Sequence, residues 1–123
     1  MNWPSFDRNK PLTLAAARNA ALVNQLATPG LGTLMVGRIA LGCAQLALAI
    51  AGFLGVLTWF GCVLHQYYGQ ISGDVTVRPV AWMGISGGIL FIAAWVWALF
   101  TSLGLIREAR RLSVPPLLPP ERL

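Results

Sequence analysis

The sequence predicts an all-α integral membrane protein: a helical hairpin of two transmembrane helices preceded by a short N-terminal surface helix. Its 123 residues are 56% hydrophobic and only 11% charged, whereas a soluble domain has about 25% charged residues because its surface is hydrated. Two stretches, Ile39 to Leu64 and Pro79 to Ile106, contain no Asp, Glu, Lys or Arg. Each exceeds the roughly 20 apolar residues that cross the hydrocarbon of a bilayer.

Residues 1–30 predict a cytoplasmic arm that ends in a short helix. Thr13 is a suitable N-cap for a helix from Leu14 to about Ala27. This helix is rich in alanine and has a poor apolar face, so we expect it to lie against the membrane surface or a partner. The region also lacks the continuous apolar core of a cleavable signal peptide. We therefore expect the first span to act as an uncleaved signal anchor.

A break in the helix is predicted at Thr28-Pro29-Gly30, before a first span over residues 31–65. Proline disfavours helix at the preceding residue and lacks a backbone N–H, and glycine tolerates positive φ. Arg38 follows near the start of the span, where its stem lies along apolar surface and its guanidinium reaches polar groups. We expect Arg38 at the cytoplasmic boundary, in contact with Glu108, a lipid phosphate or the helix-terminal carbonyls near Ile106.

The segment 24–46, NQLATPGLGTLMVGRIALGCAQL, resembles the beginning of small two-helix membrane proteins related to the transmembrane-two domain. Their pattern contains an Asn, then Pro-Gly-x-Gly, then Gly-Arg/Lys-x-x-x-Gly-x-x-Gln. The matching positions are Asn24, Pro29, Gly30, Gly32, Gly37, Arg38, Gly42 and Gln45. The family often has an aromatic residue before the glycine that aligns with Gly37, where Met35 and Val36 stand here. The resemblance implies a two-helix hairpin and no defined activity.

The charges predict the orientation of the hairpin. Residues 66–78 form the expected extracytoplasmic loop, with Arg78 as its one cation and Asp74 as its one anion, while residues 79–106 form the second span. The other cations precede the first span, start it at Arg38, or lie in a basic, proline-rich tail over residues 107–123. The positive-inside rule then places both termini in the cytoplasm, with the bacterial inner membrane as the expected location.

Aromatic side chains gather at the outer ends of both spans. An aromatic belt at the lipid–water interface is typical of membrane proteins. The expected interface anchors are Trp59, Tyr67, Tyr68 and Trp82. With Arg38 at the opposite boundary, these residues would fix the depth of the hairpin.

Small residues predict where helices pack, because close backbone contact supports association in lipid. On the first span, spacings of four and three residues place Gly42, Gln45, Ala49 and Gly52 on one face. On the second span, Gly84, Gly87, Gly88, Ala94, Ala98 and Ser102 lie on one side, and the expected packing residues among them are Gly84, Gly88, Ala94 and Ala98. A second small row on the first span consists of Cys43, Ala47, Ala51 and Gly55. One face closes the hairpin, and the remaining face is available to another helix.

The sequence contains no recognisable catalytic or metal-binding constellation. Between Ile39 and Leu64 and between Pro79 and Ile106 there is no acidic or basic residue for a proton or ion relay. His65 is the only histidine of the sequence. His65 is three residues from Cys62, but a protein metal site requires three or four ligands. Cys43 and Cys62 lie roughly 28 Å apart on one helix and cannot form a disulfide with each other. We expect no enzyme activity and no cofactor; a cofactor at His65, supplied by a larger complex, remains an alternative.

The sequence therefore predicts a non-catalytic membrane protein that acts through helix packing, as an accessory subunit or a homo-oligomer. Its expected partners are the lipid bilayer and a membrane protein or a second copy. No basic face carries the interleaved aromatic residues of a nucleic-acid site. A holin-like, membrane-permeabilising oligomer is an alternative, but a polar lumen has few candidates. These are Gln45, Thr58, Ser86, Thr101 and Ser102.

Overall fold

The computed structural model describes residues 11–73 and 76–115, which contain four helices and no strand. They are α1 (Leu14–Leu26), α2 (Leu31–Met35), α3 (Ile39–Ser72) and α4 (Ala81–Ser113). The all-α class is confirmed. Of these helices, α3 and α4 are long and apolar enough to cross a membrane.

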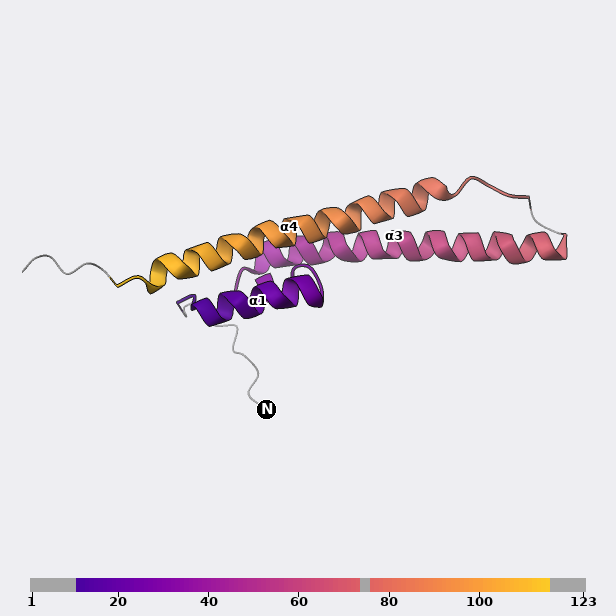
Figure 1. Ribbon diagram of the computed structural model, residues 1–123. Helices are drawn as coiled ribbons and strands as arrows, with labels where there is room; N and C mark the ends of the chain where they lie inside the picture. The colour runs from indigo at the N-terminus through magenta and orange to yellow at the C-terminus, as the bar shows by residue number, and fades with distance from the viewer. Residues whose placement is uncertain (1–10, 74–75, 116–123) are drawn as a thin grey trace, which may run out of the picture.

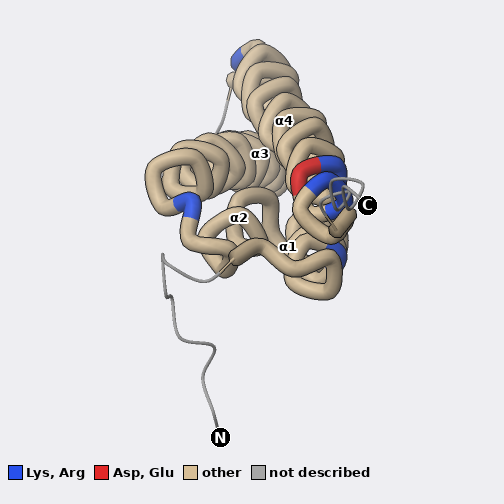
Figure 2. Tube along the Cα trace, turned by 90° about the vertical axis from the view of Figure 1, so that its left-hand side faces the viewer, with Lys and Arg blue, Asp and Glu red and all other residues tan. Residues whose placement is uncertain are grey.

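The two long helices lie side by side and run in opposite directions (Figure 1). The short helix α1 lies against the C-terminal half of α4. Viewed from the end of the molecule, α2 fills the space between α1 and α3 (Figure 2). The described part of the chain is thus a two-helix hairpin thickened at one end by the α1–α2 unit.

The helix boundaries differ from those expected because a change in polarity does not by itself end a helix. The helix α3 continues past residue 65 to Ser72 and ends at Gly73, whose φ of 77° terminates it in the left-handed region. The helix α4 continues past residue 106 to Ser113, and Val114 then adopts an extended conformation before Pro115. The expected first span is also divided at its start into α2 and α3.

The backbones of α3 and α4 touch at glycines. A Cβ built on Gly52 would lie 2.5 Å from the backbone nitrogen of Phe91, and one on Gly87 would lie 2.7 Å from that of Val56. Gly88, which was also expected to pack against a helix, does not contact α3, because a Cβ there meets nothing within 4 Å. The rotation of α4 turns Gly87 toward α3 and Gly88 away from it.

Small residues also bring α1 close to α4. Ala17 and Ala20 on α1 form a buried cluster with Leu105 and Ala109 on α4. An alanine-rich helix with little amphipathic character can pack in this way, because small side chains let two backbones approach closely. Among the described residues, the arginines gather mainly at this end of the molecule (Figure 2), whereas Arg78 precedes α4 at the far end.

Candidate functional site: a buried polar junction

The turns on either side of α2 place its backbone between α1 and α3. Gly30 precedes α2 with a φ of 97°, and Gly37 follows it with a φ of 82°. A Cβ on Gly30 would lie 2.5 Å from the Gly42 carbonyl oxygen of α3. A Cβ on Gly32 would lie 1.9 Å from the Ala20 carbonyl oxygen of α1. Any larger side chain at Gly30 or Gly32 would therefore push these helices apart.

The Asn24 side chain connects α1 to both of its neighbours. Its Oδ1 accepts hydrogen bonds from the backbone N–H groups of Gly30 and Thr33, at 3.2 Å each. Its Nδ2 donates to the Thr33 hydroxyl at 2.9 Å and to the Ser102 hydroxyl of α4 at 3.1 Å. The amide thus uses its two donors and two acceptor positions, and it caps the N-terminus of α2 from a different helix.

The hydrogen bonds continue from Thr33 across to α4. The Thr33 hydroxyl donates to Oε1 of Gln45 at 3.0 Å, and Nε2 of Gln45 donates to the Thr101 hydroxyl at 2.8 Å. The Thr101 hydroxyl in turn donates to the Trp97 carbonyl at 3.0 Å. All four helices therefore share one directional network. We call its five side chains the polar junction: Asn24, Thr33, Gln45, Thr101 and Ser102.

The polar junction is inaccessible to solvent at its centre. Asn24, Thr33 and Gln45 have no exposed surface, and Ser102 is 2% exposed. A buried amide or hydroxyl is costly unless it is hydrogen-bonded, and a satisfied network favours one arrangement of its helices over others. The five side chains are amides and hydroxyls, which hold geometry rather than exchange protons near neutral pH.

An ion pair closes the hairpin near the polar junction. The Arg38 guanidinium contacts the Glu108 carboxylate, one of the three partners expected from the sequence. Their side chains are 44% and 47% exposed. Exposed pairs of this kind contribute only about 0.2–1 kcal/mol, so the pair aligns the start of α3 with the end of α4 more than it stabilises the fold.

The expected packing residues divide between the interior and the surface. Gly42, Gln45, Ala49 and Gly52 of α3 and Ala94 and Ala98 of α4 are buried. Gly84 is half-buried, and a Cβ there would lie 2.5 Å from the Trp59 ring. The second small row of α3 is exposed at Cys43, Ala47 and Ala51. Its fourth member, Gly55, is half-buried, and a Cβ there would lie 3.0 Å from the Gly87 Cα of α4. Among the described residues, the row therefore has no partner only at Cys43, Ala47 and Ala51.

The expected aromatic anchors lie at the end opposite the polar junction. Tyr67, Tyr68 and Trp82 are exposed. The two tyrosine rings are in an edge-to-face arrangement, with their centroids 5.9 Å apart. Trp59 is half-buried because its ring covers Gly84. Trp59 thus packs α3 against α4 as well as lying near this end.

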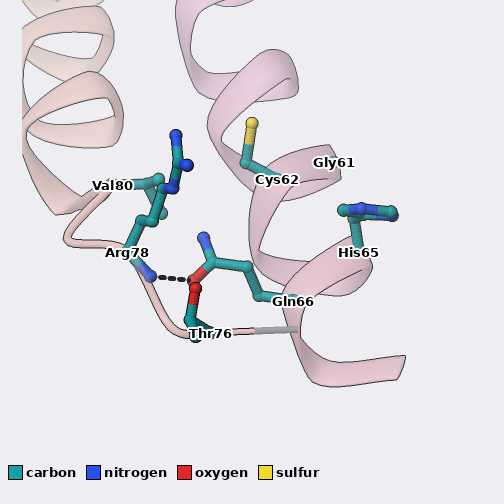
Figure 3. A pocket seen from close by; sticks show the side chains of 7 residues that line it. All are labelled: Gly61, Cys62, His65, Gln66, Thr76, Arg78 and Val80. Carbon is teal, nitrogen blue, oxygen red and sulfur yellow. Dashed lines mark hydrogen bonds between the residues drawn. The ribbon is translucent and has the colours of Figure 1, made fainter. Parts of the chain in front are cut away.

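An open groove lies between α3 and the segment before α4 at this same end (Figure 3). Oε1 of Gln66 accepts a hydrogen bond from the Arg78 backbone N–H at 2.7 Å, which ties the segment before α4 to α3. The His65 imidazole points away from Arg78 and Val80 in Figure 3, although His65 borders the groove. No group of three potential metal-binding side chains occurs in the described parts of the chain.

No family model, curated protein or solved structure matches this chain. The resemblance to the transmembrane-two domain therefore stays a prediction. Most of the residues that carry it nevertheless gather in one place. Buried around the polar junction are Asn24, Pro29, Gly30, Gly32, Gly42 and Gln45.

Sequence reasoning missed three features of this site. It gave no role to Thr33, which joins α1 to α3, and it did not pair Asn24 with Ser102. It also placed Gly87 and Gly88 on one face and singled out Gly88, whereas Gly87 makes the contact with α3. The sequence contains one signal for Asn24 and Thr33. Both lie between Arg18 and Arg38, in a stretch without charged residues, and a polar side chain that is buried in such a stretch requires a hydrogen-bond partner.

Proposed function

We propose that this protein is a non-catalytic integral membrane protein that acts through helix packing, as an accessory subunit of a membrane complex or as a homo-oligomer. The polar junction is the observation that carries the proposal. Its side chains are bonded to one another inside the chain, so they stabilise a shape rather than offer groups to a substrate. In lipid, such hydrogen bonds and close contacts at small residues hold helices together.

The exposed surface of the hairpin supports this proposal. One side of α4 presents large apolar side chains to the outside, among them Ile85, Ile89, Ile92 and Phe100. Such a surface is suited to lipid tails. The exposed row of Cys43, Ala47 and Ala51 on α3 lacks bulky side chains and would let a helix of a partner or second copy approach closely.

The proposed location is the bacterial inner membrane, with both termini in the cytoplasm. Arg18, Arg38, Arg107, Arg110 and Arg111 lie at the end of the molecule where α3 begins and α4 finishes (Figure 2). Arg78 is the cation near the opposite end. An excess of cations on one side of the spans is typical of the cytoplasmic side.

The permeabilising alternative has less support because the polar side chains of the spans are already bonded. Gln45 and Thr101 bond each other in the polar junction. The hydroxyls of Thr58 and Ser86 donate to carbonyls of their own helices, at Leu54 and Met83. A polar lumen that used Gln45, Thr101 or Ser102 would require the polar junction to open. The cofactor alternative at His65 would need ligands from another protein.

Purification in mild detergent, followed by native mass and absorbance measurements, tests the proposal. We expect a defined stoichiometric assembly with a partner or with further copies, and no visible absorbance. A monomer in detergent and in nanodiscs, with no partner recovered, would contradict the packing role. Dye release from vesicles by the purified protein would favour the permeabilising alternative, and a pigment spectrum would favour the one based on His65.

A further inference from the structure

We propose that residues 14–38 form a re-entrant helical hairpin, which enters the cytoplasmic leaflet as α1, turns at residues 27–30 and returns as α2, with its outer face in contact with lipid acyl chains. The inference rests on the proposed membrane insertion of α3 and α4. It replaces the expected surface helix with a segment inside one leaflet. Four observations support it: the depth of the turn, the arginines that flank the segment, the hydrogen-bonded N–H groups of the turn, and the apolar outer face of the second half of α1.

The turn between α1 and α2 lies deep along the spans. Ala27, Thr28 and Pro29 line one groove together with Ala49 of α3 and Phe91 of α4. Ala49 is about three helical turns beyond Arg38, or roughly 16 Å at 1.5 Å per residue. Half of a hydrocarbon core is about 15 Å. If Arg38 lies at the interface, the turn reaches close to the middle of the bilayer.

Arginines bracket this segment at the level of the headgroups. From Asn19 to Gly37 the chain has no Asp, Glu, Lys or Arg, and Arg18 and Arg38 stand at its two ends. Arg18 is exposed and follows Ala17, which packs in the cluster that contains Ala109. The start of α1 is therefore level with the basic end of α4. If the chain enters the cytoplasmic leaflet after Arg18 and leaves it before Arg38, both arginines lie on the cytoplasmic side of the membrane.

The turn meets the requirement for irregular backbone at membrane depth. Such backbone occurs only where it is buried in protein or lines an aqueous cavity, because lipid offers no hydrogen bonds. Pro29 and Gly30 are buried. The N–H of Thr28 donates to Val23, that of Leu31 to Thr28, and that of Gly30 to the Asn24 side chain. Pro29 has no N–H to satisfy.

The polarity of α1 is the reverse of that of a helix docked in water. This reversal is confined to the second half of α1, where Asn24 is buried and Leu22 and Leu26 face outward, with Leu26 81% exposed. In the first half, which lies near the headgroups, Arg18 and Asn19 are exposed. On α2, Leu31 and Met35 are also exposed. A helix at an aqueous surface normally turns its polar side outward. The outer face of the hairpin is thus matched to the same acyl chains that surround α3 and α4.

Depth-dependent quenching tests the proposal on the full chain in vesicles of defined lipid. The background carries Cys43→Ala and Cys62→Ala, and single cysteines at Leu26, Phe53 or Asn19 carry an environment-sensitive fluorophore. Leu26 and Phe53 are exposed in the chain, so the label disturbs little packing. Lipids with a nitroxide near the chain end should quench Leu26→Cys and Phe53→Cys more than headgroup nitroxides do. Asn19→Cys should show the opposite order.

The outcomes separate this inference from the proposed membrane insertion. Quenching of Leu26→Cys by aqueous iodide, with Phe53→Cys protected, would overturn the re-entrant hairpin and leave the spans intact. Access of iodide to Phe53→Cys as well would overturn membrane insertion itself. Protection of Leu26→Cys from both iodide and lipid nitroxides would show a protein at this face and would overturn the lipid contact. Leu22→Cys provides a second site on the same face.

Discussion

Asn24 and Ser102 lie 78 positions apart in the sequence, and a 3.1 Å hydrogen bond joins the amide of one to the hydroxyl of the other. This bond connects α1 to α4, the first and last helices of the part of the chain that the structure describes. It makes Asn24 the residue through which α1, α2 and α4 share one arrangement.

Replacing Asn24 with Ala should destabilise the protein more than any other single change in the polar junction. The change removes the cap of α2 and leaves buried donors and acceptors unpaired, at about 1–3 kcal/mol for each group left unsatisfied. Unfolding in a detergent titration measures the loss. Asn19→Ala is the matched control, because Asn19 lies on the same helix and is exposed. Equal stability of the two variants would contradict the role given to Asn24.

Gln45 and Thr101 should show energetic coupling. Their hydrogen bond of 2.8 Å joins α3 to α4, and double-mutant cycles in membrane proteins give about 0.6 kcal/mol on average and about 1.7 at most. The cycle compares Gln45→Leu, Thr101→Val and the double variant. We expect a coupling in that range. Strict additivity of the two changes would mean that the bond does not hold the helices together.

Gly87→Ala should weaken the contact between α3 and α4, and Gly88→Ala should not. A methyl group on Gly87 meets the backbone at Val56 and Gly55, whereas one on Gly88 meets open space. Overpacking costs typically 1–3 kcal/mol, while alanine favours a helix over glycine by up to about 1 kcal/mol. The free energy of unfolding should therefore decrease in Gly87→Ala and increase in Gly88→Ala. If Gly88→Ala lowered the free energy of unfolding more than Gly87→Ala, the main packing face of α4 would be the one that carries Gly88 and faces a partner.

Arg38→Lys should be tolerated, because a lysine also reaches the interface and the Glu108 carboxylate. Arg38→Leu should reduce the stability of the hairpin by about the 0.2–1 kcal/mol of an exposed ion pair, and added salt should reduce the difference. Glu108→Gln should have a similar effect. Loss of function in Arg38→Lys with normal assembly would indicate a bidentate contact to a ligand or substrate.

Labelling of single cysteines in intact cells tests the orientation. In the cysteine-free background, Ser72→Cys at the end of α3 should react with an impermeant reagent, and Ser113→Cys at the end of α4 should react only after lysis. Both positions are exposed, so access depends on the side of the membrane. Reaction of Ser113→Cys from outside would reverse the proposed topology.

The sequence allowed the two long helices to be predicted because a charge-free stretch of sufficient length is a local signal. The inward face of α3 was also predictable, since Gly42, Gln45, Ala49 and Gly52 share a helical stripe. The docking of α1 was not, because its alanines give little periodic contrast and its partner Ser102 lies far along the chain. Gly87 and Gly88 are about 100° apart around a helix, so only the rotation of α4 decides between them.

The bond from Asn24 to Ser102 also sets an order of events during biosynthesis. The N-terminal unit leaves the ribosome first, but the hydroxyls of Thr101 and Ser102 that complete its network belong to the last helix. Until α4 has been inserted, the Asn24 and Gln45 amides lack their partners on it. A nascent chain that stops before Ser102 would keep these polar groups uncovered in the bilayer, the kind of exposed group by which quality-control proteases can distinguish an unfinished chain from a completed one.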